Sequence, residues 1–552
     1  MSQIDPVFAA VTAPGTPFEL LERDGLLQFA QTAPDLALMI EHARRHGDKT
    51  FLIDFSADGA ERRLTFEQVF AWRDQLAPML GIRRGDRVAI CMRNRAEWIV
   101  AFMAVIKAGG VAALLNSRGS PAELAAMIAE VTPEVVLADS RRAALIREGG
   151  YDGRMLDLTQ PFDEAEIARR NADAPAPGSP LDPAAILFTS GTTGRVKGAV
   201  LTHRSLITGL MLMQLSGMMV LHNMARAHGM EPAQLMAAMP QQAVLLVYPL
   251  FHISGLGAAF LSPLFAGSKV VIMRRWDADE AAHLIAAEKI TMFSAVPTML
   301  WDLLHRAKPG EADLTSLRNI ASGGQALPVN LLDAIREACP QAVMGTGYGM
   351  TEASGSLAQA VGEDFLRKRS SAGRVLPLAQ VRIVAPDGTV QGTGASGEIQ
   401  LKGAMVMAGY WNRPEDTAAA FTTDGWLRTG DVGYIDDEGY IFIVDRVKDM
   451  VISGGENIYC AEVERVLGEL GGVGECAAFG IPDERLGELL VAVVRGEGLN
   501  EQQVKDWVGE RLARYKAPGH VALVADALPR NHVGKVDKVA LRAAWPKLYG
   551  EQ

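Results

Sequence analysis

Short apolar runs rich in β-branched residues alternate with amphipathic helical patterns along most of the chain. Residues 87–92 (RVAICM) have the composition of a strand, residues 97–107 repeat apolar positions at helical spacing, and residues 109–115 again resemble a strand. The side of this helix expected to face the core carries Val100, Phe102, Met103 and Ile106. Similar strand and helix patterns follow over residues 270–273, 278–288, 291–295, 297–307, 319–321 and 331–338. The repeated strand–helix–strand order predicts an α/β fold with mostly parallel sheets.

The pattern changes in the last third of the chain, where short strands are separated by Asp-Gly, Glu-Gly and Gly-Gly turns. We therefore expect a large N-terminal domain over residues 1–445, with a β-rich subdomain at about 375–445, and a small α+β C-terminal domain over residues 446–552. Helices of the C-terminal domain are expected at residues 461–470 and 501–514. Residues 172–183, rich in Ala, Pro, Asp and Gly, are typical of a linker.

Composition narrows the class of protein. The chain has 552 residues, 49% of them hydrophobic and 22% charged, which is typical of a soluble globular enzyme with more than one domain. Its net charge of −11 argues against a general nucleic-acid binder. The cysteines form neither closely spaced metal-ligand pairs nor a disulfide framework, so a reducing cytoplasm is expected. They are Cys91, Cys339, Cys460 and Cys476.

Two apolar stretches pass a simple hydropathy test. Residues 205–221 are rich in Met and Leu, and residues 243–265 carry no formal charge over a length that could cross a bilayer. Gly, Ser, Gln and Pro residues interrupt them, so we expect a buried helix and buried strands rather than membrane spans. The N-terminus has no basic region followed by an apolar one, and no secretory signal is predicted. Transient contact with a membrane surface is an alternative that the sequence does not decide.

Residues 187–198 (LFTSGTTGRVKG) place glycines, hydroxyl side chains and a lysine directly after an apolar strand. Gly191, Gly194 and Gly198 allow backbone N–H groups to approach an oxyanion, and Lys197 adds positive charge. The hydroxyl donors are Thr189, Ser190, Thr192 and Thr193. The spacing differs from a Walker A motif, in which Ser or Thr follows the lysine. The segment predicts a phosphate-binding loop, whereas a flexible surface turn would explain only the glycines.

Other polar clusters are ambiguous when each is taken alone. Residues 348–352 (YGMTE) could form a turn into a helix capped by Thr351, and residues 429–431 (TGD) could form a hairpin turn. His252 could be a core histidine, and Lys535 a solvated surface charge. Their order and spacing along the chain favour a functional interpretation.

Taken together, these segments resemble the adenylate-forming superfamily, which contains acyl-CoA synthetases, aryl-CoA ligases, peptide-synthetase adenylation domains and luciferases. The similarity extends over roughly residues 25–545. It rests on LFTSGTTGRVKGAVLTH, YPLFHISG, IASGGQALP, TGYGMTE, the long segment from GYWNRPEDT to NIYCAEVE, and LPRNHVGK. The resemblance implies an AMP-forming acid–thiol ligase that uses ATP, Mg²⁺ and coenzyme A.

The resemblance assigns roles in the first half-reaction, in which the substrate carboxylate attacks the α-phosphate of ATP and pyrophosphate leaves. It implies that the phosphate loop cradles the β- and γ-phosphates, that Thr351 contacts the α-phosphate, and that Glu352 binds Mg²⁺. Lys535 would bridge the carboxylate and the α-phosphate, and Asp431 would accept the ribose hydroxyls with help from Arg446. The implied loop contacts are Thr189, Ser190, Gly191, Thr192, Thr193, Gly194 and Lys197, and the adenine contacts are Gly323, Gly324, Gln325 and Tyr348.

The second half-reaction, attack of a thiol on the acyl-adenylate, needs other groups at the same centre. The resemblance implies that the C-terminal domain rotates about a hinge near residues 445–449, with Lys448 at the hinge position. The rotation would withdraw Lys535, and His252 would gate the path between acid and thiol. Gly454, Gly455, Glu456 and Asn457 would line the pantetheine tunnel. Asp445 departs from the more common Gly before Arg446, and His532-Val533 replaces smaller residues.

The substrate is the least constrained feature. Eight methionines between residues 211 and 239 precede the histidine segment, and methionine lines adaptable apolar surfaces, so a medium- or long-chain fatty acid is favoured over an aryl acid. Plain core packing would explain the same methionines. The alternatives are an aryl-CoA ligase, a ligase that loads a carrier protein, a luciferase-like oxygenase and a non-catalytic nucleotide-binding relative. The expected partners are small molecules: the acid, ATP and CoA. A homodimer is a further alternative that the sequence does not decide.

Overall fold

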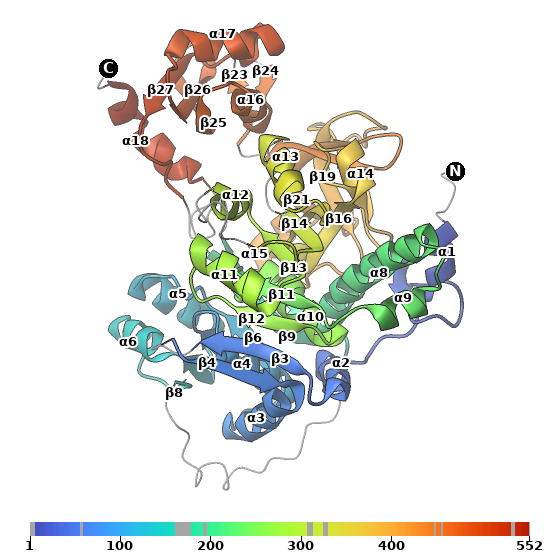
Figure 1. Cartoon of the computed structure of the whole chain (residues 1–552). Coiled ribbons are helices and arrows are strands. Elements are labelled where there is room, and N and C mark those ends of the chain that lie inside the picture. Colours follow the sequence, from blue (N-terminus) through green and yellow to red (C-terminus); the bar gives the residue numbers. More distant parts are fainter. Residues whose placement is uncertain are drawn as a thin grey trace. The chain divides into compact units, whose positions relative to one another are not determined.

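The computed structural model describes residues 6–55, 59–159, 178–190, 196–305, 313–323, 329–446, 449–453, 456–530 and 536–550 (Figure 1). Two compact units are formed. Unit one comprises Met1–Val381 and Leu401–Leu427, and unit two comprises Arg382–Gln400 and Arg428–Gln552.

A seven-stranded sheet forms one half of unit one, in the order β20-β10-β9-β6-β5-β7-β8. Its strands are β5 Arg87–Cys91, β6 Val111–Leu114, β7 Val135–Ala138, β8 Met155–Asp157, β9 Pro183–Ser190, β10 Val196–Thr202 and β20 Gly409–Tyr410. The strands from β9 to β8 pair in parallel, whereas β10 is antiparallel to both β9 and β20. Helices α4 Ala96–Lys107, α5 Pro121–Val131 and α6 Ser140–Glu148 connect the parallel strands. The parallel β-α-β order that the sequence predicts is confirmed here.

A nine-stranded sheet has the order β17-β16-β15-β14-β13-β11-β12-β3-β4. Its strands are β3 Thr50–Phe55, β4 Glu61–Thr65, β11 Ala243–Leu246, β12 Lys269–Ile272, β13 Met292–Ala295, β14 Asn319–Gly323, β15 Val343–Met350, β16 Gly355–Val361 and β17 Arg374–Val375. The strands from β3 to β15 are parallel, and β4, β16 and β17 add antiparallel edges. The crossover helices are α11 Ala278–Glu288, α12 Pro297–His305 and α13 Val329–Ala338, and α11 packs on β11 (Figure 1).

Helix α4 is buried on more sides than its sequence pattern predicts. The pattern predicts one buried side, but every residue from Ala96 to Ile106 is buried. The helix contacts β5 and β6 of one sheet and β3 of the other, so both of its sides face apolar neighbours. The Trp98 and Phe102 rings stack with centroids 5.8 Å apart. An all-round apolar helix of this kind belongs between layers.

Helix α8 (His203–Ala227) contains the first of the two apolar stretches. By length and composition it could cross a membrane, but half of its most apolar window is buried inside unit one, as in the core helix of a folded domain. The second stretch contributes β11, the π-helix η2 (Ser254–Leu261) and α10 (Ser262–Ala266). Every residue of β11 is buried, as expected, whereas in α8 only half of the most apolar window is buried.

The remaining elements of unit one surround the two sheets. They are α1 Pro6–Val11, β1 Leu20–Arg23, β2 Leu26–Phe29, α2 Leu36–His42, the 3₁₀ turn η1 Ala43–His46, α3 Phe66–Met79, α9 Pro232–Ala238, the 3₁₀ turn η3 Thr351–Ala353, α14 Glu363–Arg367 and α15 Pro414–Ala420.

Unit two combines two smaller sheets. The four-stranded sheet has the order β18-β19-β21-β22, and the other has the order β24-β23-β26-β25, with β27 also paired to β26. The strands are β18 Gln380–Val384, β19 Gly397–Lys402, β21 Leu427–Ile435, β22 Ile441–Arg446, β23 Val451–Ser453, β24 Glu456–Ile458, β25 Val473–Asp483, β26 Gly487–Gly496 and β27 His520–Val524. The helical elements are α16 Cys460–Gly468, α17 Glu501–Arg511, the 3₁₀ turn η4 Arg514–Lys516 and α18 Lys538–Gly550. The predicted fold class is confirmed, whereas the boundary at residue 445 and the hinge stay predictions.

Candidate active site

Several predicted site residues lie at one edge of the nine-stranded sheet. Parallel strands place their carboxyl ends at the same edge, which is where open α/β sheets bind ligands. Gly323 ends β14 and pairs with Gly347 on β15, directly before Tyr348. His252 follows β11, its ring centroid 4.6 Å from that of Phe251. Strands β14 and β15 are neighbours, and β11 lies in the same parallel part of the sheet, so these predicted segments follow strands that run in one direction.

Thr351 and Glu352 occupy a tight turn just beyond β15. Strand β15 extends to Met350, and residues Thr351–Ala353 form a single 3₁₀ turn that ends at Ser354, where φ is +53°. The interpretation of this segment as the start of a capped helix is therefore wrong. Glu352 is 8% exposed, and its backbone carbonyl accepts a hydrogen bond of 2.8 Å from the N–H of Met407. A buried carboxylate is thus held at the carboxyl edge of the sheet.

The phosphate-loop segment is a hairpin connection between two strands. Its first residues, through Ser190, continue β9, and Val196–Gly198 already belong to β10. Lys197 pairs with Thr189 across the two strands, and the Thr189 hydroxyl lies 3.4 Å from the Lys197 carbonyl oxygen. Strand pairing between β9 and β10 therefore extends into the predicted phosphate segment from both sides. Residues 191–195, with four of the predicted phosphate contacts, lie outside the described residues.

Tyr410 connects the phosphate-loop lysine to Glu352. Its hydroxyl donates a hydrogen bond of 2.9 Å to Glu352 Oε1, and Lys197 Nζ lies 5.3 Å from the centre of its ring. Burial and the adjacent Glu352 carboxylate raise the pKa of the Tyr410 phenol well above its usual range. The phenol therefore keeps its proton at neutral pH and remains a hydrogen-bond donor.

Lys197 also forms an ion pair. Its ammonium group contacts Asp416 Oδ1, and the two side chains are 16% and 32% exposed. Arg413 lies on the same segment as Asp416, and its Nη2 forms an ion pair with Glu130 Oε2 at 2.7 Å. The segment from Gly409 to Asp416 thus brings a phenol and a carboxylate to the lysine that the sequence places in the phosphate site.

In unit two, Asp431 lies inside strand β21 and pairs in register with Arg446 on β22. Its N–H donates to the hydroxyl of Thr429 at 3.1 Å, and that hydroxyl donates to the Ile399 carbonyl at 2.7 Å. The interpretation of these residues as a hairpin turn is wrong, because they continue a nine-residue strand. The strand pairing places the backbone of Asp431 opposite that of Arg446, and their shared role at the ribose stays a prediction.

Asp445 has a local structural role. It is 5% exposed, and its Oδ2 accepts a hydrogen bond of 3.2 Å from the N–H of Ala461 in the first turn of α16. A carboxylate at a helix N-terminus satisfies a free N–H group and complements the helix dipole. This contact accounts for an aspartate at the position where the family more commonly has Gly.

The other predicted residues are only partly described. Glu456 and Asn457 form β24, with backbone described alone, as for Ser190 and Arg446. The predicted residues outside the described part of the chain are Gly191, Thr192, Thr193, Gly194, Gly324, Gln325, Lys448, Gly454, Gly455 and Lys535. Their roles stay predictions.

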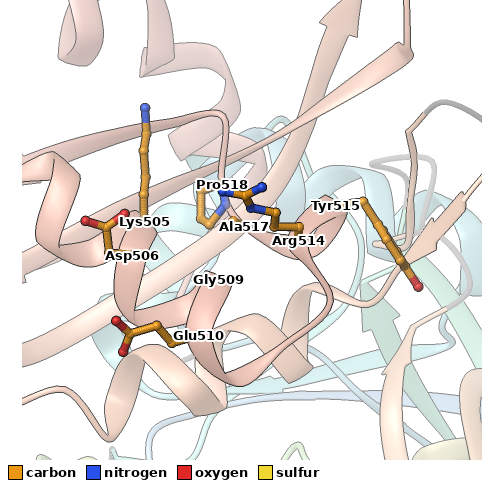
Figure 2. Close-up of a pocket in the computed structure, with 8 residues that line it drawn as sticks. All are labelled: Lys505, Asp506, Gly509, Glu510, Arg514, Tyr515, Ala517 and Pro518. Atoms are coloured by element: carbon orange, nitrogen blue, oxygen red, sulfur yellow. The ribbon is translucent and has the colours of Figure 1, made fainter.

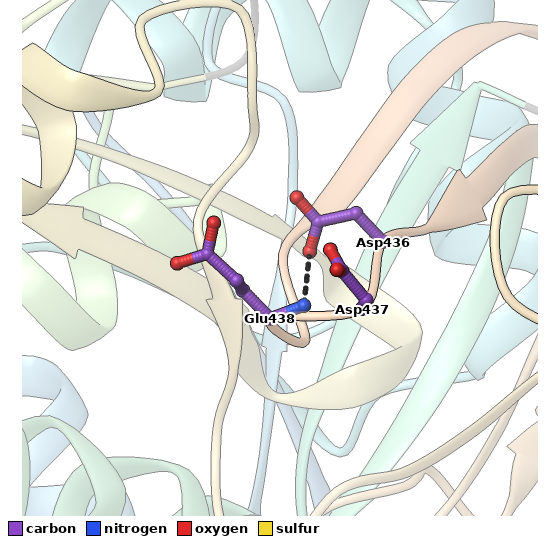
Figure 3. Close-up of side chains that lie close together, drawn as sticks. All are labelled: Asp436, Asp437 and Glu438. Carbon is purple, nitrogen blue, oxygen red and sulfur yellow. Dashed lines mark hydrogen bonds between the residues drawn. The ribbon is translucent and has the colours of Figure 1, made fainter.

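Two further features of unit two resemble sites. Asp436, Asp437 and Glu438 bring their carboxylates within 4.8 Å of one another (Figure 3), but Asp436 Oδ1 accepts the N–H groups of Glu438 at 3.0 Å and Tyr440 at 2.9 Å, as in an ordinary turn. A depression of about 650 Å³ is lined mainly by α17 and the turn after it (Figure 2). Its lining includes two basic side chains, Lys505 and Arg514, and two acidic ones, Asp506 and Glu510, so it has no net charge of either sign.

Sequence reasoning did not single out Tyr410 or Asp416. Both lie in the GYWNRPEDT segment that carries part of the resemblance, but Asp416 is 219 residues from Lys197, and Tyr410 is 58 residues from Glu352. No periodicity connects residues so far apart, so only the paired strands β10 and β20 reveal the contact.

Comparisons with known proteins cover both units. A family model described as AMP-binding enzyme matches residues 39–411, and one described as AMP-binding enzyme C-terminal domain matches residues 462–535. The long-chain-fatty-acid–CoA ligase FadD13 of Mycobacterium tuberculosis is 35% identical over 87% of this chain and 93% of its own. A feruloyl-CoA synthase of Amycolatopsis is 35% identical over 84% and 89%. The o-succinylbenzoate coenzyme A synthetase of Bacillus subtilis, solved with ATP and magnesium ion, gives a TM-score of 0.74 at 31% identity over 90% and 98%.

Proposed function

The chain belongs to the AMP-binding enzyme family and is an acid–thiol ligase of the AMP-forming type, and from this we propose that it activates a hydrophobic carboxylic acid, with a medium- or long-chain fatty acid as the first choice. The acid would form acyl-AMP with release of pyrophosphate, and the acyl group would then pass to coenzyme A. The observation that carries the proposal is the contact network that joins Lys197 of the phosphate segment to Glu352 through Tyr410.

A magnesium ion fits the described residues. Mg²⁺ prefers oxygen ligands and uses few protein carboxylates, together with water and phosphate oxygens. The hydrogen bond from Tyr410 is made to Oε1 of Glu352, and among the described residues no side chain bonds Oε2, the oxygen that we propose faces the cation. The ion, when bound, would neutralise charge on the phosphates. Glu352 is therefore the proposed metal ligand.

The proposed roles of the chain's own residues follow from charge. Lys197 would neutralise the outgoing pyrophosphate and Thr351 would donate to the α-phosphate, while Lys535 would bring the substrate carboxylate to it. Asp431 would accept the ribose hydroxyls, because an ionised carboxylate is an acceptor only. Residues Gly323 and Tyr348, at adjacent strand ends, would border the adenine.

The second half-reaction would use the other predicted residues. We propose that Lys448 is the hinge about which the C-terminal domain turns, that His252 gates the path between acid and thiol, and that residues 454–457 line the pantetheine tunnel. Domain turning would separate two chemistries that need different groups at one centre.

The substrate class is supported by the surroundings of helix α8. Met211 is buried, and Met218 and Met219 are partly buried against the same apolar cluster as Tyr348 and Ile253. Helix α8 also contacts β16, the strand that pairs with β15 at Tyr348, and methionine adapts to apolar ligands, so this helix suits an acid with a hydrocarbon chain. An aryl acid is the second candidate, because the named relatives include a feruloyl-CoA synthase as well as a fatty-acid ligase.

The test uses purified protein with MgATP and two acid series, saturated fatty acids of increasing length and hydroxycinnamic acids, each with and without CoA. AMP, pyrophosphate and thioester are followed by mass spectrometry. The proposal predicts acyl-AMP without CoA, thioester with CoA, and a higher kcat/KM for a fatty acid than for any aryl acid. A preference for the aryl series would reassign the substrate, and absence of pyrophosphate with every acid would contradict the proposed reaction.

A further inference from the structure

The backbone of Tyr410 is fixed on two sides. Strand β20 pairs with β10 so that Tyr410 lies opposite Ala199, two residues after Lys197. The N–H of Tyr410 donates to the hydroxyl of Thr417 at 2.9 Å, and this hydroxyl donates to the Arg413 carbonyl at 2.8 Å. Tyr410 therefore cannot shift without breaking either a sheet contact or the start of α15.

The side chain of Tyr410 has two polar neighbours on different elements. Its hydroxyl bonds Glu352 in the turn after β15, and its ring faces the ammonium group of Lys197 on β10. A cation near an aromatic face is attracted by the ring electrons. One side chain thus positions the proposed phosphate cation and the proposed metal ligand at the same time.

Asp416 completes the arrangement as the ion-pair partner of Lys197. Arg413 Nη1 lies 3.9 Å from Asp416 Oδ2, so this carboxylate is itself held between two cations. A phosphate that binds Lys197 therefore competes with Asp416 for the positive charge of the ammonium group.

We infer that Tyr410 and Asp416 are positioning residues for nucleotide and metal binding: Tyr410 orients Glu352 toward the cation, and Asp416 holds Lys197 until phosphate takes its place. This inference rests on the proposed function, because it takes Glu352 as the metal ligand. Residues that bond a metal ligand fix its orientation, and their loss lowers metal affinity. The two residues have opposite effects on ligand affinity: Tyr410 strengthens metal binding, whereas Asp416 competes with phosphate for Lys197.

The first test is Tyr410→Phe, which removes the hydroxyl and keeps the ring beside Lys197. Binding of Mn²⁺, as a substitute for Mg²⁺, is measured by electron paramagnetic resonance with saturating ATP and no carboxylic acid. We expect the Mn²⁺ dissociation constant to rise about tenfold, the lower end of the range for residues that bond a metal ligand. In activity assays the Mg²⁺ requirement should rise in parallel, with the KM for the acid unchanged.

The matched control is Tyr151→Phe, since the Tyr151 hydroxyl also makes one hydrogen bond, to the Arg154 carbonyl at 3.2 Å. This variant should bind Mn²⁺ as the wild type does. Equal Mn²⁺ affinity in Tyr410→Phe and wild type would overturn the role of Tyr410.

The second test is Asp416→Asn, which keeps the shape of the side chain and removes its charge. Because Lys197 no longer has to leave a carboxylate, we expect ATP to bind about two- to fivefold more tightly by calorimetry, the size expected for a partly exposed ion pair. The control is Asp364→Asn, which removes a carboxylate 3.7 Å from Arg367 on α14. Unchanged or weaker ATP binding in Asp416→Asn would overturn the role of Asp416.

These binding assays contain no carboxylic acid, so they remain informative if the proposed substrate is wrong. If the wild-type protein binds Mn²⁺ and ATP but activates no acid, the proposed function is contradicted. The variants of Tyr410 and Asp416 still decide the inference about these two residues.

Discussion

In unit one the acidic side chains of the candidate site, Glu352 and Asp416, bond to other side chains, whereas Asp436 and Asp445 of unit two bond to backbone N–H groups. In unit one, Lys197 contacts Asp416, and Tyr410 contacts Glu352, so three segments that are distant in sequence meet. In unit two, Asp436 accepts two N–H groups of its own turn, and Asp445 accepts the N–H of Ala461.

This difference separates two kinds of site. A side-chain cluster is preassembled, so removing one member leaves its partner without a bond and changes ligand affinity directly. A carboxylate that binds backbone instead stabilises a turn or a helix end, and its loss lowers the free energy of unfolding.

Lys535→Ala should give the largest effect. If Lys535 acts only in the adenylation step, the rate of acyl-AMP formation should fall about 10²- to 10³-fold, the cost of removing one group that stabilises transition-state charge. Transfer of the acyl group from synthetic acyl-AMP to CoA should persist, and so should ATP binding by unit one. Single-turnover measurements of each half-reaction test this, with Lys547→Ala as an exposed-lysine control on α18. An equal loss of rate in both half-reactions would contradict a role of Lys535 in adenylation alone.

Asp431→Ala tests whether a unit-two carboxylate contributes to the nucleotide. The ribose hydroxyls would lose a charged acceptor, and hydrogen bonds to charged groups are worth about 1.5–3 kcal/mol, so the KM for ATP should rise tenfold or more. Asp437→Ala changes an exposed carboxylate of the same β21–β22 hairpin and should leave that KM unchanged. A normal KM for ATP in Asp431→Ala would restrict the nucleotide site to unit one.

Asp445→Ala should act on stability rather than on affinity. Loss of the acceptor at the start of α16 should lower the free energy of unfolding by about 1 kcal/mol, the usual cost of losing a helix cap. Asp445→Asn keeps an acceptor oxygen and should lose less, because only the charge near the helix dipole is removed. Urea unfolding measures both variants, and equal stability of all three proteins would contradict the capping role.

Three buried thiols and the partly buried thiol of Cys476 give a finer comparison of the two units. Burial raises the pKa of Cys91 and Cys476 to about 12 and that of Cys339 to about 11, and it raises the pKa of Cys460 as well. Thiolate is the reactive form, so at pH 8 iodoacetamide should modify these cysteines only after local opening, and faster as the pH rises toward their pKa values. In Asp445→Ala, labelling of Cys460 and Cys476 should accelerate while labelling of Cys91 and Cys339 should not. Mass spectrometry of digested protein tests this, and equal acceleration in both units would show that they open together.

The sequence by itself determined the elements and the chemistry. Apolar periodicity predicted strands at residues 87–92 and 291–295 and a helix at 278–288, and the structure has them at Arg87–Cys91, Met292–Ala295 and Ala278–Glu288. These patterns are local, because a strand or a helix buries its apolar side at fixed spacing. The motifs also revealed the family, which the comparisons confirm, whereas the roles that the resemblance assigns to single residues stay predictions.

The tertiary structure decided which of those residues meet and what else joins them. The sequence could not show that α4 is buried on all sides, because that depends on two sheets formed by distant segments. Nor could it show that Tyr410 lies between Lys197 and Glu352, since the pairing of β10 with β20 brings these residues together. Contacts between distant segments follow from strand order and sheet packing, and no period in the sequence encodes them.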